Sequence, residues 1–548
     1  MIHPAKQILL WLFFCLILTA CSSVDPDVKR TRIDEFLNYQ AQLNKFNGTV
    51  LIAQGDKILL TKGYGYRNVE NNVPHDTSSV FQIYSITKTF TSTLIFKLIE
   101  QKKLSLTDPL NKFYPAFPNG DKITIEHLLT HTSGINDDSD PNAPPTEAYR
   151  VARFGSNTPH FAPGEGWSYC NGGYQLLGYI IQKVAGMSYE QAIRKNIFQP
   201  LGMSHSGFDY TALSRPEKST AYRVFTNNNK QIAVLYDSAG PFSAGAIYAT
   251  TGDLYKYYRS FRTHQIIGAR SQEMAFAPSK TNDGYGYGWQ LKKETMQPTV
   301  VSHSGGAAGF RSNFAMIPGE GICIIILNNH ENANPEYLTG KILEILHDKP
   351  VELVPEVTLK PADLEKCEGA FYFTKPRQMM AYTSVVDGRL AIDVDGQGKM
   401  ILVAKDANTF IQDEAHAELR FTKEAEGVYT ALEVDQGVFQ KMGGTRIESA
   451  WGIIGDATPK GWDEASPDLK LTEQKQPPGL WFIENVVLKK GEWKFRRDNS
   501  WNTNFGDNEP DKMLDANGRN IQVEGGVYDI TLDLTDETKP RYTIIRKN

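Results

Sequence analysis

Two different hydrophobic periods divide the chain. Between about residues 28 and 347, helical spacing alternates with short β-branched runs such as 49–53 and 323–327. This mixture of helical and strand periods predicts an α/β (α + β) body. The helical spacing is clearest just after residue 88, where the apolar positions are Phe90, Leu94, Ile95, Leu98 and Ile99. From about residue 363 the period becomes two, which predicts β-strands.

Proline and turn residues mark the boundaries between regions. Pro350, Pro355 and Pro361 interrupt the pattern, so residues 348–362 are predicted to be a linker. Within 363–447, the turn Asp387-Gly388 separates two alternating runs, 382–386 and 390–394, which predicts a β-hairpin in a small antiparallel barrel or sandwich. Residues 449–548 form another β-rich region that holds five of the eight Trp residues: Trp451, Trp462, Trp481, Trp493 and Trp501.

The amino terminus has the pattern of an export signal. Residues 8–18 are apolar, and this run is shorter than the roughly 20 residues that a membrane-spanning helix needs. Leu18-Thr19-Ala20-Cys21 resembles a bacterial lipobox. We therefore expect residues 1–20 to be a lipoprotein signal peptide, Cys21 to carry the lipid, and the mature protein to be anchored in the cell envelope, at a bacterial outer membrane. A plain secretory signal with a chance cysteine is the alternative.

Composition narrows the classes of partner. The 548 residues correspond to about three domains at roughly 100–200 residues each. A net charge of −5 leaves no basic surplus for neutralising phosphates, so we expect no nucleic-acid partner. Cys15 would leave with the signal peptide, and Cys21 would carry lipid. The remaining Cys170, Cys323 and Cys367 are too few for a disulfide framework, although one bridge between two of them stays open.

Ser85 and Lys88 are the first candidates for chemistry. They are three residues apart at the start of the apolar helical pattern, so both can lie on one face of its first turn. A desolvated Lys amine there can accept the Ser proton, and the helix amino end favours developing negative charge. Alone, the pair is weak evidence, because a helix-capping Ser beside a solvated Lys has the same spacing.

Two further motifs strengthen this interpretation. Tyr169-Cys170-Asn171 precedes an apolar helical run, and His303-Ser304-Gly305-Gly306 lies on a predicted strand. In this order, the three motifs resemble the serine β-lactamase and penicillin-binding protein superfamily, in the branch of class C β-lactamases, D,D-peptidases and esterases. The resemblance covers about residues 45–345, and its other matching segments are 123–134, 200–203, 243–245 with Asp253, and 285–289.

The resemblance implies a catalytic role for four residues. Ser85 is the nucleophile that forms an acyl-enzyme, and Lys88 with Tyr169 is the proton shuttle. The backbone N–H groups of Ser85 and Gly306 form the oxyanion hole. The implied substrate is a small molecule or peptide, and the implied mechanism needs no metal and no cofactor.

Four other motif residues are expected to bind substrate. Asn171 orients the substrate amide, while His303, Ser304 and Gly305 line the strand along which substrate lies. Position 303 departs from the Lys that most β-lactamases of this branch carry, which favours a peptidase, amidase or esterase. If His303 must be cationic to hold a substrate carboxylate, we expect kcat/KM to fall above about pH 7 as this histidine loses its proton.

Some residues have competing interpretations. His127 and His131 have the i, i+4 spacing of two zinc ligands, but Leu128 stands where a zinc protease of the H-E-x-x-H type has Glu. Cys170 is interpreted as a small spacer within its motif. Three aromatic residues are expected either to wall the cleft or to fill the core: Tyr285, Tyr287 and Trp289.

The two C-terminal regions resemble known β modules. Residues 363–447 resemble the lipocalin-like barrel that follows such hydrolase domains. Residues 449–548 resemble the immunoglobulin-like β-sandwich domains of SusE/SusF starch-binding proteins. That resemblance implies an α-glucan site at Trp462, Lys494, Trp501 and Asn520, in which indole rings stack on sugars. A purely structural sandwich is the alternative.

The sequence thus predicts a lipid-anchored serine hydrolase that acts on a D-amino-acid peptide, amide or ester through an acyl-enzyme and can react with β-lactams. The alternative is a surface glycan-binding protein whose hydrolase domain is vestigial. The intact set of Ser85, Lys88 and Tyr169 argues against that alternative.

Overall fold

The computed structural model of the chain describes residues 25–138, 144–294, 297–375, 379–394, 399–437, 441–448, 450–459, 461–462, 468–474, 479–498, 500–536 and 538–547. The chain divides into two compact units, one ending at Leu353 and one beginning at Val354, inside the expected linker. The expected signal peptide and Cys21 lie outside the described residues. Within the described part, no helix is both long and apolar enough to cross a membrane.

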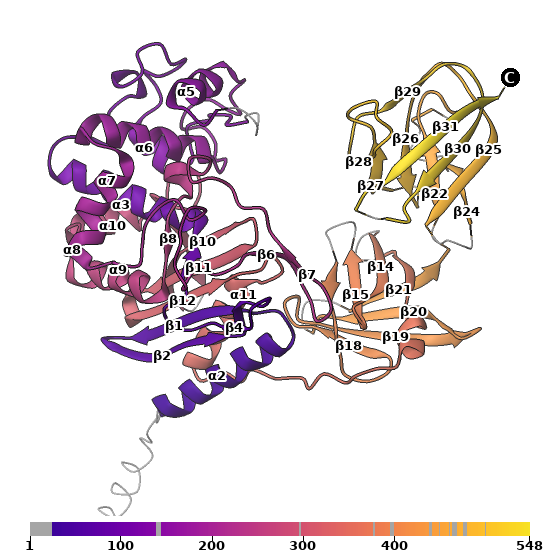
Figure 1. Ribbon diagram of the computed structural model, residues 1–548, viewed down its shortest axis with the longest axis horizontal. Helices are drawn as coiled ribbons and strands as arrows, with labels where there is room; N and C mark the ends of the chain where they lie inside the picture. The colour runs from indigo at the N-terminus through magenta and orange to yellow at the C-terminus, as the bar shows by residue number, and fades with distance from the viewer. Residues whose placement is uncertain are drawn as a thin grey trace, which may run out of the picture. The chain divides into compact units, whose positions relative to one another are not determined.

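A six-stranded antiparallel sheet forms the centre of the first unit (Figure 1). Its strand order is β2-β1-β12-β11-β10-β9. The first strand of the chain pairs with the last of this unit, with Val50 opposite Ile326. The strands are β1 (Gly48–Gln54), β2 (Lys57–Tyr64), β9 (Gln290–Glu294), β10 (Gln297–Ala307), β11 (Phe310–Ile317) and β12 (Ile322–Asn328).

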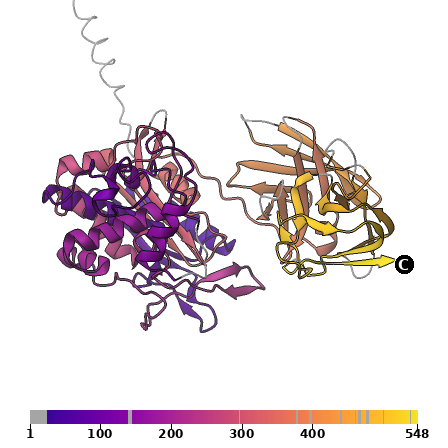
Figure 2. The ribbon, with the colours of Figure 1, turned by 90° about the horizontal axis from the view of Figure 1, so that it is seen from above.

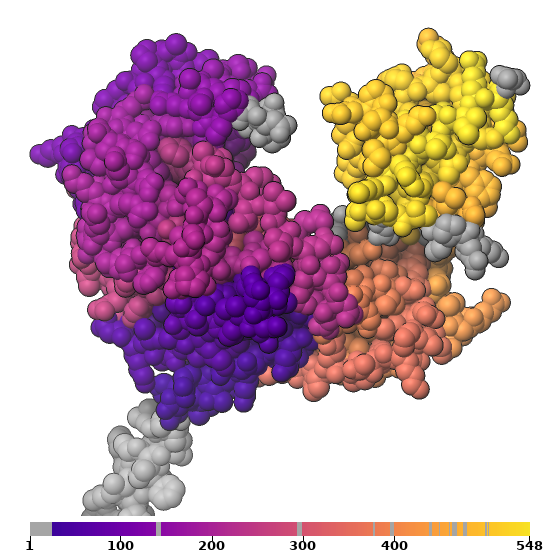
Figure 3. All heavy atoms as spheres, viewed as in Figure 1, coloured from indigo at the N-terminus to yellow at the C-terminus, as the bar shows by residue number. Residues whose placement is uncertain are grey.

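Alternating residues of the sheet serve two different cores. Val50 and Ile52 of β1 pack with α2 (Pro26–Gln42) and α11 (Pro335–Leu346) on one face. Leu51 and Ala53 belong to the larger core on the opposite face. This follows from the two-residue period of a strand. The N-terminal segment, indigo in Figure 3, covers one end of the unit.

The larger core is built around one almost entirely buried helix, α3 (Thr87–Glu100). Its residues Phe90, Leu94 and Leu98 are four apart and each at most 3% exposed. Figures 1 and 2 show the surrounding helical layer. Its helices are α4 (Ile125–Leu129), α5 (Glu147–Ser156), α6 (Asn171–Ala185), α7 (Tyr189–Ile193), α8 (Gln199–Leu201), α9 (Thr251–Thr263) and α10 (Ala269–Ala275).

The second unit begins with α12 (Pro361–Glu365) and a nine-stranded antiparallel sheet. Residues 400–404 supply β16 (Met400–Ile401), which pairs with β15, and β17 (Val403–Ala404), which pairs with β18, so this short stretch nearly closes the sheet into a barrel. The other strands are β13 (Gly369–Phe373), β14 (Met379–Val386), β15 (Arg389–Val394), β18 (Thr409–Gln412), β19 (Ala417–Ala425), β20 (Val428–Asp435) and β21 (Lys441–Ile447).

The predicted hairpin at 382–394 is confirmed. β14 pairs antiparallel with β15, and Asp387 and Gly388 between them have φ of 54° and 75°. Positive φ at both positions is typical of the tight turn that an Asp-Gly pair favours.

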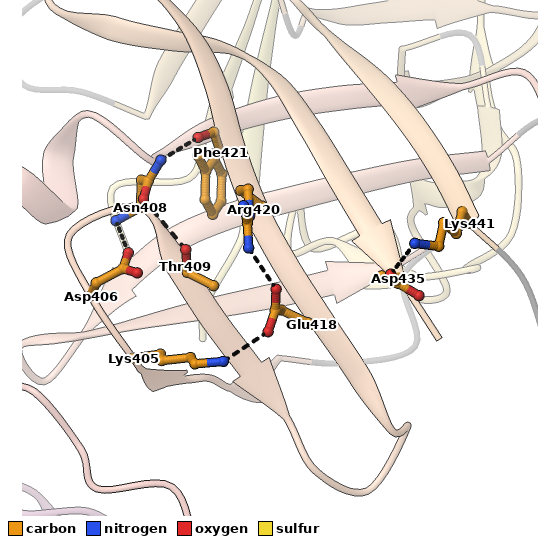
Figure 4. Close-up of polar contacts among 9 residues, drawn as sticks. All are labelled: Lys405, Asp406, Asn408, Thr409, Glu418, Arg420, Phe421, Asp435 and Lys441. Carbon is orange, nitrogen blue, oxygen red and sulfur yellow. Dashed lines mark hydrogen bonds and ion pairs between the residues drawn. The ribbon is translucent and has the colours of Figure 1, made fainter. Parts of the chain in front are cut away.

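Ion pairs cover part of the barrel's outer face. Glu418 of β19 accepts from Lys405 at 3.1 Å and from Arg420 at 2.9 Å, and Lys441 lies 2.7 Å from Asp435 (Figure 4). Exposed pairs of this kind contribute little net stability, because water screens the attraction between the charges. The stability of the barrel therefore depends mainly on its apolar interior, which includes Phe371, Phe410 and Phe421.

The last region of the chain is a sandwich of two antiparallel sheets, which belongs to the same compact unit as the barrel. One sheet contains β22 (Trp451–Ile454), β23 (Leu469–Lys470), β26 (Gly491–Arg497), β27 (Ser500–Gly506), β28 (Asp515–Ala516) and β29 (Ile521–Val523). The other contains β24 (Thr472–Gln474), β25 (Leu480–Leu488), β30 (Gly526–Asp533) and β31 (Arg541–Lys547). Three of the five Trp residues fill their common core: Trp451, Trp481 and Trp493.

Candidate active site

Ser85 lies in a sharp turn at the entrance to α3. The 3₁₀ turn Tyr84–Ile86 joins β5 (Phe81–Gln82) to the helix, so Ser85 precedes α3 and only Lys88 belongs to it. Tyr84 has φ of 43°, a left-handed conformation that non-glycine residues seldom adopt. The surrounding core therefore imposes a strained backbone on the residue before Ser85.

Lys88 is completely buried beside the Ser85 hydroxyl. Its Nζ lies 3.1 Å from Ser85 Oγ, 2.8 Å from Asn171 Oδ1 and 3.0 Å from the carbonyl oxygen of Ala244. These three partners are uncharged. Burial lowers the pKa of Lys88 to about 7, and the more distant Cys170 and Asp137 oppose this shift. At neutral pH, a large share of the amines is therefore unprotonated and can accept a proton.

Tyr169 and Asn171 reach the same point from the start of α6. Cys170 between them is the N-cap of this helix, and its Sγ accepts from the Gly173 N–H at 3.2 Å. Cys170 therefore caps α6 in addition to separating Tyr169 from Asn171. Tyr169 is hydrogen-bonded to Ser85, and burial raises the pKa of its phenol. Tyr169 thus stands beside Ser85 as a neutral phenol that can donate a proton.

His131 holds the segment around Tyr169. Its carbonyl oxygen accepts from the Ser168 N–H at 3.0 Å, and its Nδ1 accepts from the Cys170 N–H at 3.0 Å. Its ring packs on the Tyr169 ring, with centroids 4.4 Å apart. Burial, with nearby Lys88 and His303, keeps the pKa of His131 well below its usual value. The sequence placed His131 in a segment that resembles the family's framework, but nothing local to that segment shows these bonds.

The zinc interpretation does not fit this geometry. Nδ1 of His131 already accepts from backbone, and Nδ1 of His127 accepts from the Thr124 N–H at 3.4 Å in a helix-capping box. Within the described residues, no group of three or more His, Cys, Asp or Glu side chains could hold a metal ion.

His303 lies on β10, as predicted, but the expectation of a cation there is wrong. The side chain is 1% exposed, its Nδ1 lies 2.6 Å from the Ser304 carbonyl oxygen, and its Nε2 lies 3.0 Å from the Tyr285 hydroxyl. The neutral ring satisfies both contacts by donating from Nδ1 and accepting at Nε2. Burial, reinforced by Lys88, lowers the pKa of His303 to about 3. His303 therefore offers no charge to a substrate carboxylate near neutral pH.

The other β10 residues also have roles within the fold. A Cβ at Gly305 would lie 2.1 Å from the Ile83 carbonyl oxygen, so glycine lets β10 approach the turn that carries Ser85. This contact accounts for Gly305 without the close substrate approach that we expected. The Ser304 N–H donates to Gln290 Oε1 at 3.1 Å. Gly306 is exposed.

A cavity of about 530 Å³ opens at this site. Ser85, Asn171, Ala244 and Gly306 contribute to its wall. Motifs that are far apart in the sequence therefore face one space large enough for a small molecule or a peptide end. The cavity also reaches residues that sequence reasoning did not single out: Asp137, Asp138, Tyr149, Arg150 and Tyr236.

The aromatic residues of segment 285–289 differ in burial, and none of them is in the described wall of this cavity. Tyr285 is 3% exposed and contacts His303. Trp289 is 0% exposed and packs against Phe261 and Phe276 in the core. Tyr287 is half-buried and donates to Glu126 Oε1 at 2.8 Å.

The four predicted glycan residues all lie in the sandwich. Trp462 and Trp501 are half-buried, with ring centroids 6.0 Å apart. Lys494 of β26 donates to Asn504 Oδ1 at 2.9 Å, and Asn520 donates to Glu492 Oε2 at 2.7 Å. Lys494 and Glu492 alternate with the buried Trp493, so their side chains lie on the face of β26 opposite the core.

The described cysteines form no disulfide with one another. Cys170, Cys323 and Cys367 are all free and buried. This result settles the pairing that the sequence left open for these three residues.

Comparisons with known proteins agree with the sequence resemblance. A family model described as Beta-lactamase matches residues 36–349, more than half of the chain. Penicillin-binding protein 4* of Bacillus subtilis (strain 168) is 30% identical over 429 residues, covering 72% of this chain and 94% of that protein. The putative penicillin-binding protein PbpX of the same strain is 31% identical over 320 residues, covering 58% of this chain and 79% of that protein.

Solved structures show the same fold. An octameric penicillin-binding protein homologue from Pyrococcus abyssi superposes with a TM-score of 0.55 at 25% identity, covering 76% of this chain and 99% of that one. A D-amino acid amidase from Ochrobactrum anthropi SV3, complexed with L-phenylalanine amide, has a TM-score of 0.51 at 21% identity, covering 59% and 99%. The Pyrococcus match extends beyond the first unit.

Proposed function

This chain belongs to the beta-lactamase family, and the members of that family that are similar to it indicate a serine hydrolase. We therefore propose that it hydrolyses a D-amino-acid amide, peptide or ester through an acyl-enzyme on Ser85. The observation that carries this proposal is the buried Lys88 amine, which lies 3.1 Å from Ser85 Oγ and, among the residues that the structure describes, hydrogen-bonds to uncharged groups. The resemblance to D,D-peptidases and esterases supplies the substrate class.

The geometry supports a complete proton cycle. Neutral Lys88 takes the proton of Ser85 while Oγ bonds to the substrate carbonyl carbon. The bond to the leaving group then breaks, Tyr169 gives its proton to that group, and Lys88 returns a proton to Tyr169. Water repeats the exchange: its oxygen bonds to the acyl carbon, one proton passes through the shuttle to Ser85 Oγ, and the acid is released.

The oxyanion that forms in each step needs donors. We assign this role to the backbone N–H groups of Ser85 and Gly306, since both residues face the cavity. One such donor contributes about 3–4 kcal/mol where its loss has been measured in other hydrolases.

Labelling of Ser85 is the direct test. A fluorophosphonate probe should attach to Ser85, as found by peptide mass spectrometry, and Ser85→Ala should abolish both labelling and ester turnover. Folded wild-type protein that neither labels nor turns over any activated ester would contradict the proposal and favour a glycan-binding protein with a vestigial hydrolase domain.

The pH profile tests the assigned base. Because the pKa of Lys88 is lowered to about 7, the fraction of neutral amine rises with pH. We expect kcat/KM to increase about tenfold per pH unit below pH 7 and to level off above it. This direction is opposite to the one expected from a cationic His303, and a profile that falls between pH 7 and 8 would overturn the assignment.

We further propose an α-glucan site on the outer face of the sandwich, at Trp462, Lys494, Trp501 and Asn520. The partly exposed pair of indole rings supports it, because such rings stack on sugars at small entropic cost. Isothermal titration with maltoheptaose should show binding that weakens at least tenfold in the Trp462→Ala/Trp501→Ala variant. Absence of heat at millimolar glucan would favour a structural sandwich.

We also propose export and lipid anchoring through Cys21. Expression in a bacterial host with a radiolabelled fatty acid should label the protein, and Cys21→Ser should abolish the label. A labelled Cys21→Ser variant would contradict this assignment.

A further inference from the structure

The cavity at Ser85 extends to one side of the nucleophile. Its described wall includes Asn171, Gly306 and Ala307, but neither Tyr169 nor His303. Asn171 faces this cavity, whereas Tyr169, which protonates the leaving group in the proposed cycle, is not part of its described wall. The cavity is therefore the place where the acyl part of the substrate is held.

A carboxylate without a cationic partner lies in this acyl cavity. Asp137 is half-buried, and its Oδ2 accepts from the Gly172 N–H at 2.7 Å. The Cys170 thiol is hydrogen-bonded to the same carboxyl group. Across the part of the chain that the structure describes, no Lys or Arg forms an ion pair with Asp137. Asp138 beside it is exposed and also lines the cavity.

The Arg residue of the cavity wall does not neutralise these carboxylates. Nη2 of Arg150 donates to the carbonyl oxygens of Ala239, at 2.8 Å, and Gly240, at 2.6 Å. Its Nη1 donates to the Tyr179 hydroxyl at 3.2 Å. The guanidinium is thus occupied by the fold, and in the part of the wall that the structure describes Arg150 forms no ion pair with Asp137 or Asp138.

Aromatic rings complete this environment. Tyr149 and Tyr236 line the same cavity as Asp137. Ring faces attract cations, and a carboxylate beside them favours an ammonium group over a neutral or anionic one. Arg311, which lies beside Gly306, donates from Nη1 to the carbonyl oxygens of Ala307 and Phe310.

On the side of the site where the leaving group lies, His303 supplies no positive charge. His303 lies near Tyr169, with ring centroids 6.3 Å apart, and both of its nitrogens are engaged by Ser304 and Tyr285. A carboxylate is normally held by a cationic donor. His303 therefore does not supply the charge that a leaving group with a terminal carboxylate requires.

From these two sides together, and resting on the proposed hydrolase function, we propose that the substrate carries an ammonium on its acyl group, bound by Asp137, and a leaving group without a carboxylate. An amide or ester of a D-amino acid with a free α-amine has this chemistry. The reaction is the cycle already described and needs no additional reactant.

Four chromogenic anilides test both halves of the proposal at pH 7. The acyl group is D-alanine or N-acetyl-D-alanine, and the released amine is p-nitroaniline or its carboxylated analogue 5-amino-2-nitrobenzoate. We expect kcat/KM to be at least tenfold higher for the free amine than for the acetylated acyl group. We also expect it to be at least tenfold higher for the uncharged leaving group.

Variants of neighbouring residues then locate the ammonium site. Asp137→Asn keeps an oxygen that can accept from Gly172 but removes the charge, so the preference for the free amine should fall at least tenfold. In the matched control Asp138→Asn, the same preference should change less than threefold. Thermal unfolding of both variants shows whether the fold is retained.

The outcomes separate this proposal from the one on which it rests. Wild-type protein that is labelled at Ser85 but prefers acetylated or carboxylated substrates, or turns over none of the four, overturns the ammonium proposal and leaves the hydrolase intact. An unchanged preference in folded Asp137→Asn also overturns it. Absence of Ser85 labelling overturns the hydrolase itself.

Discussion

Lys88 in the first unit and Arg496 in the second are both buried cationic side chains, but their partners differ. Lys88 contacts a hydroxyl, an amide oxygen and a backbone carbonyl. Arg496 forms a two-point ion pair with Asp468, at 2.6 and 3.0 Å, in which both side chains are at most 2% exposed. One cation is surrounded by neutral groups, and the other is matched by a carboxylate.

This difference separates a catalytic group from a structural one. A buried amine without an anion loses much of its preference for the charged form, so it becomes a base near neutral pH. A buried guanidinium stays charged, and a bidentate carboxylate compensates the loss of its hydration. Both side chains are buried, and the partner decides what each one does.

The largest effect is expected when Lys88 is made permanently cationic. Lys88→Arg retains a positive charge that cannot act as a base, so kcat/KM should fall by about 10³- to 10⁴-fold. Lys88→Met, which is neutral and similar in length, is the control for folding and should be equally inactive with an unchanged melting temperature. An arginine variant with more than a tenth of wild-type activity would contradict the role of Lys88 as the base.

The next effect concerns stability in the other unit. Asp468→Ala leaves the charge of Arg496 buried and unpaired, which should cost about 3–5 kcal/mol of unfolding free energy. Urea unfolding followed by Trp fluorescence measures it, because Trp451 and Trp493 lie in the same core. Ester turnover at 25 °C should not change.

A double variant is the control for this pair. Asp468→Leu with Arg496→Met removes both charges and should recover most of the lost stability, since apolar side chains often replace a buried ion pair without a net cost. A loss below about 1 kcal/mol in the single variant would mean that Arg496 is not held by Asp468.

Local patterns predicted the parts of the molecule that depend on nearby residues. Ser85 and Lys88 are three positions apart, and the Asp387-Gly388 turn is adjacent to both strands that it joins. The position of Trp493 in an alternating strand is likewise a local signal, although the sequence alone did not separate it from the half-buried Trp462. Periodicity and turn chemistry are encoded within a few residues.

The protonation states could not be predicted in the same way. His303 was correctly placed on a strand, but its neutrality depends on Tyr285, which is 18 positions earlier. Likewise, the hydrogen bond from the Gly172 N–H to Asp137 joins residues 35 positions apart, and the one from the Cys170 N–H to His131 joins residues 39 positions apart. Near-closure of the barrel depends on residues 400–404 pairing with two different strands. Such contacts are set by tertiary packing, which carries no local sequence signal.

The smallest effect is expected from substitutions of His131, which helps to hold neutral groups around Lys88. His131 accepts from the Cys170 N–H through Nδ1 and has φ of 61°, so Asn is the closest replacement: its side-chain oxygen can reach the same N–H, and it tolerates positive φ. We expect His131→Asn to keep kcat within about threefold, whereas His131→Leu, which lacks the acceptor, should lose about tenfold in kcat with little change in KM. Steady-state kinetics at pH 8, where Lys88 is mostly neutral, measures both values. Equal losses in the two variants would show that His131 acts through packing alone, because only the Asn side chain preserves the hydrogen bond that places Tyr169 and Asn171 around the amine.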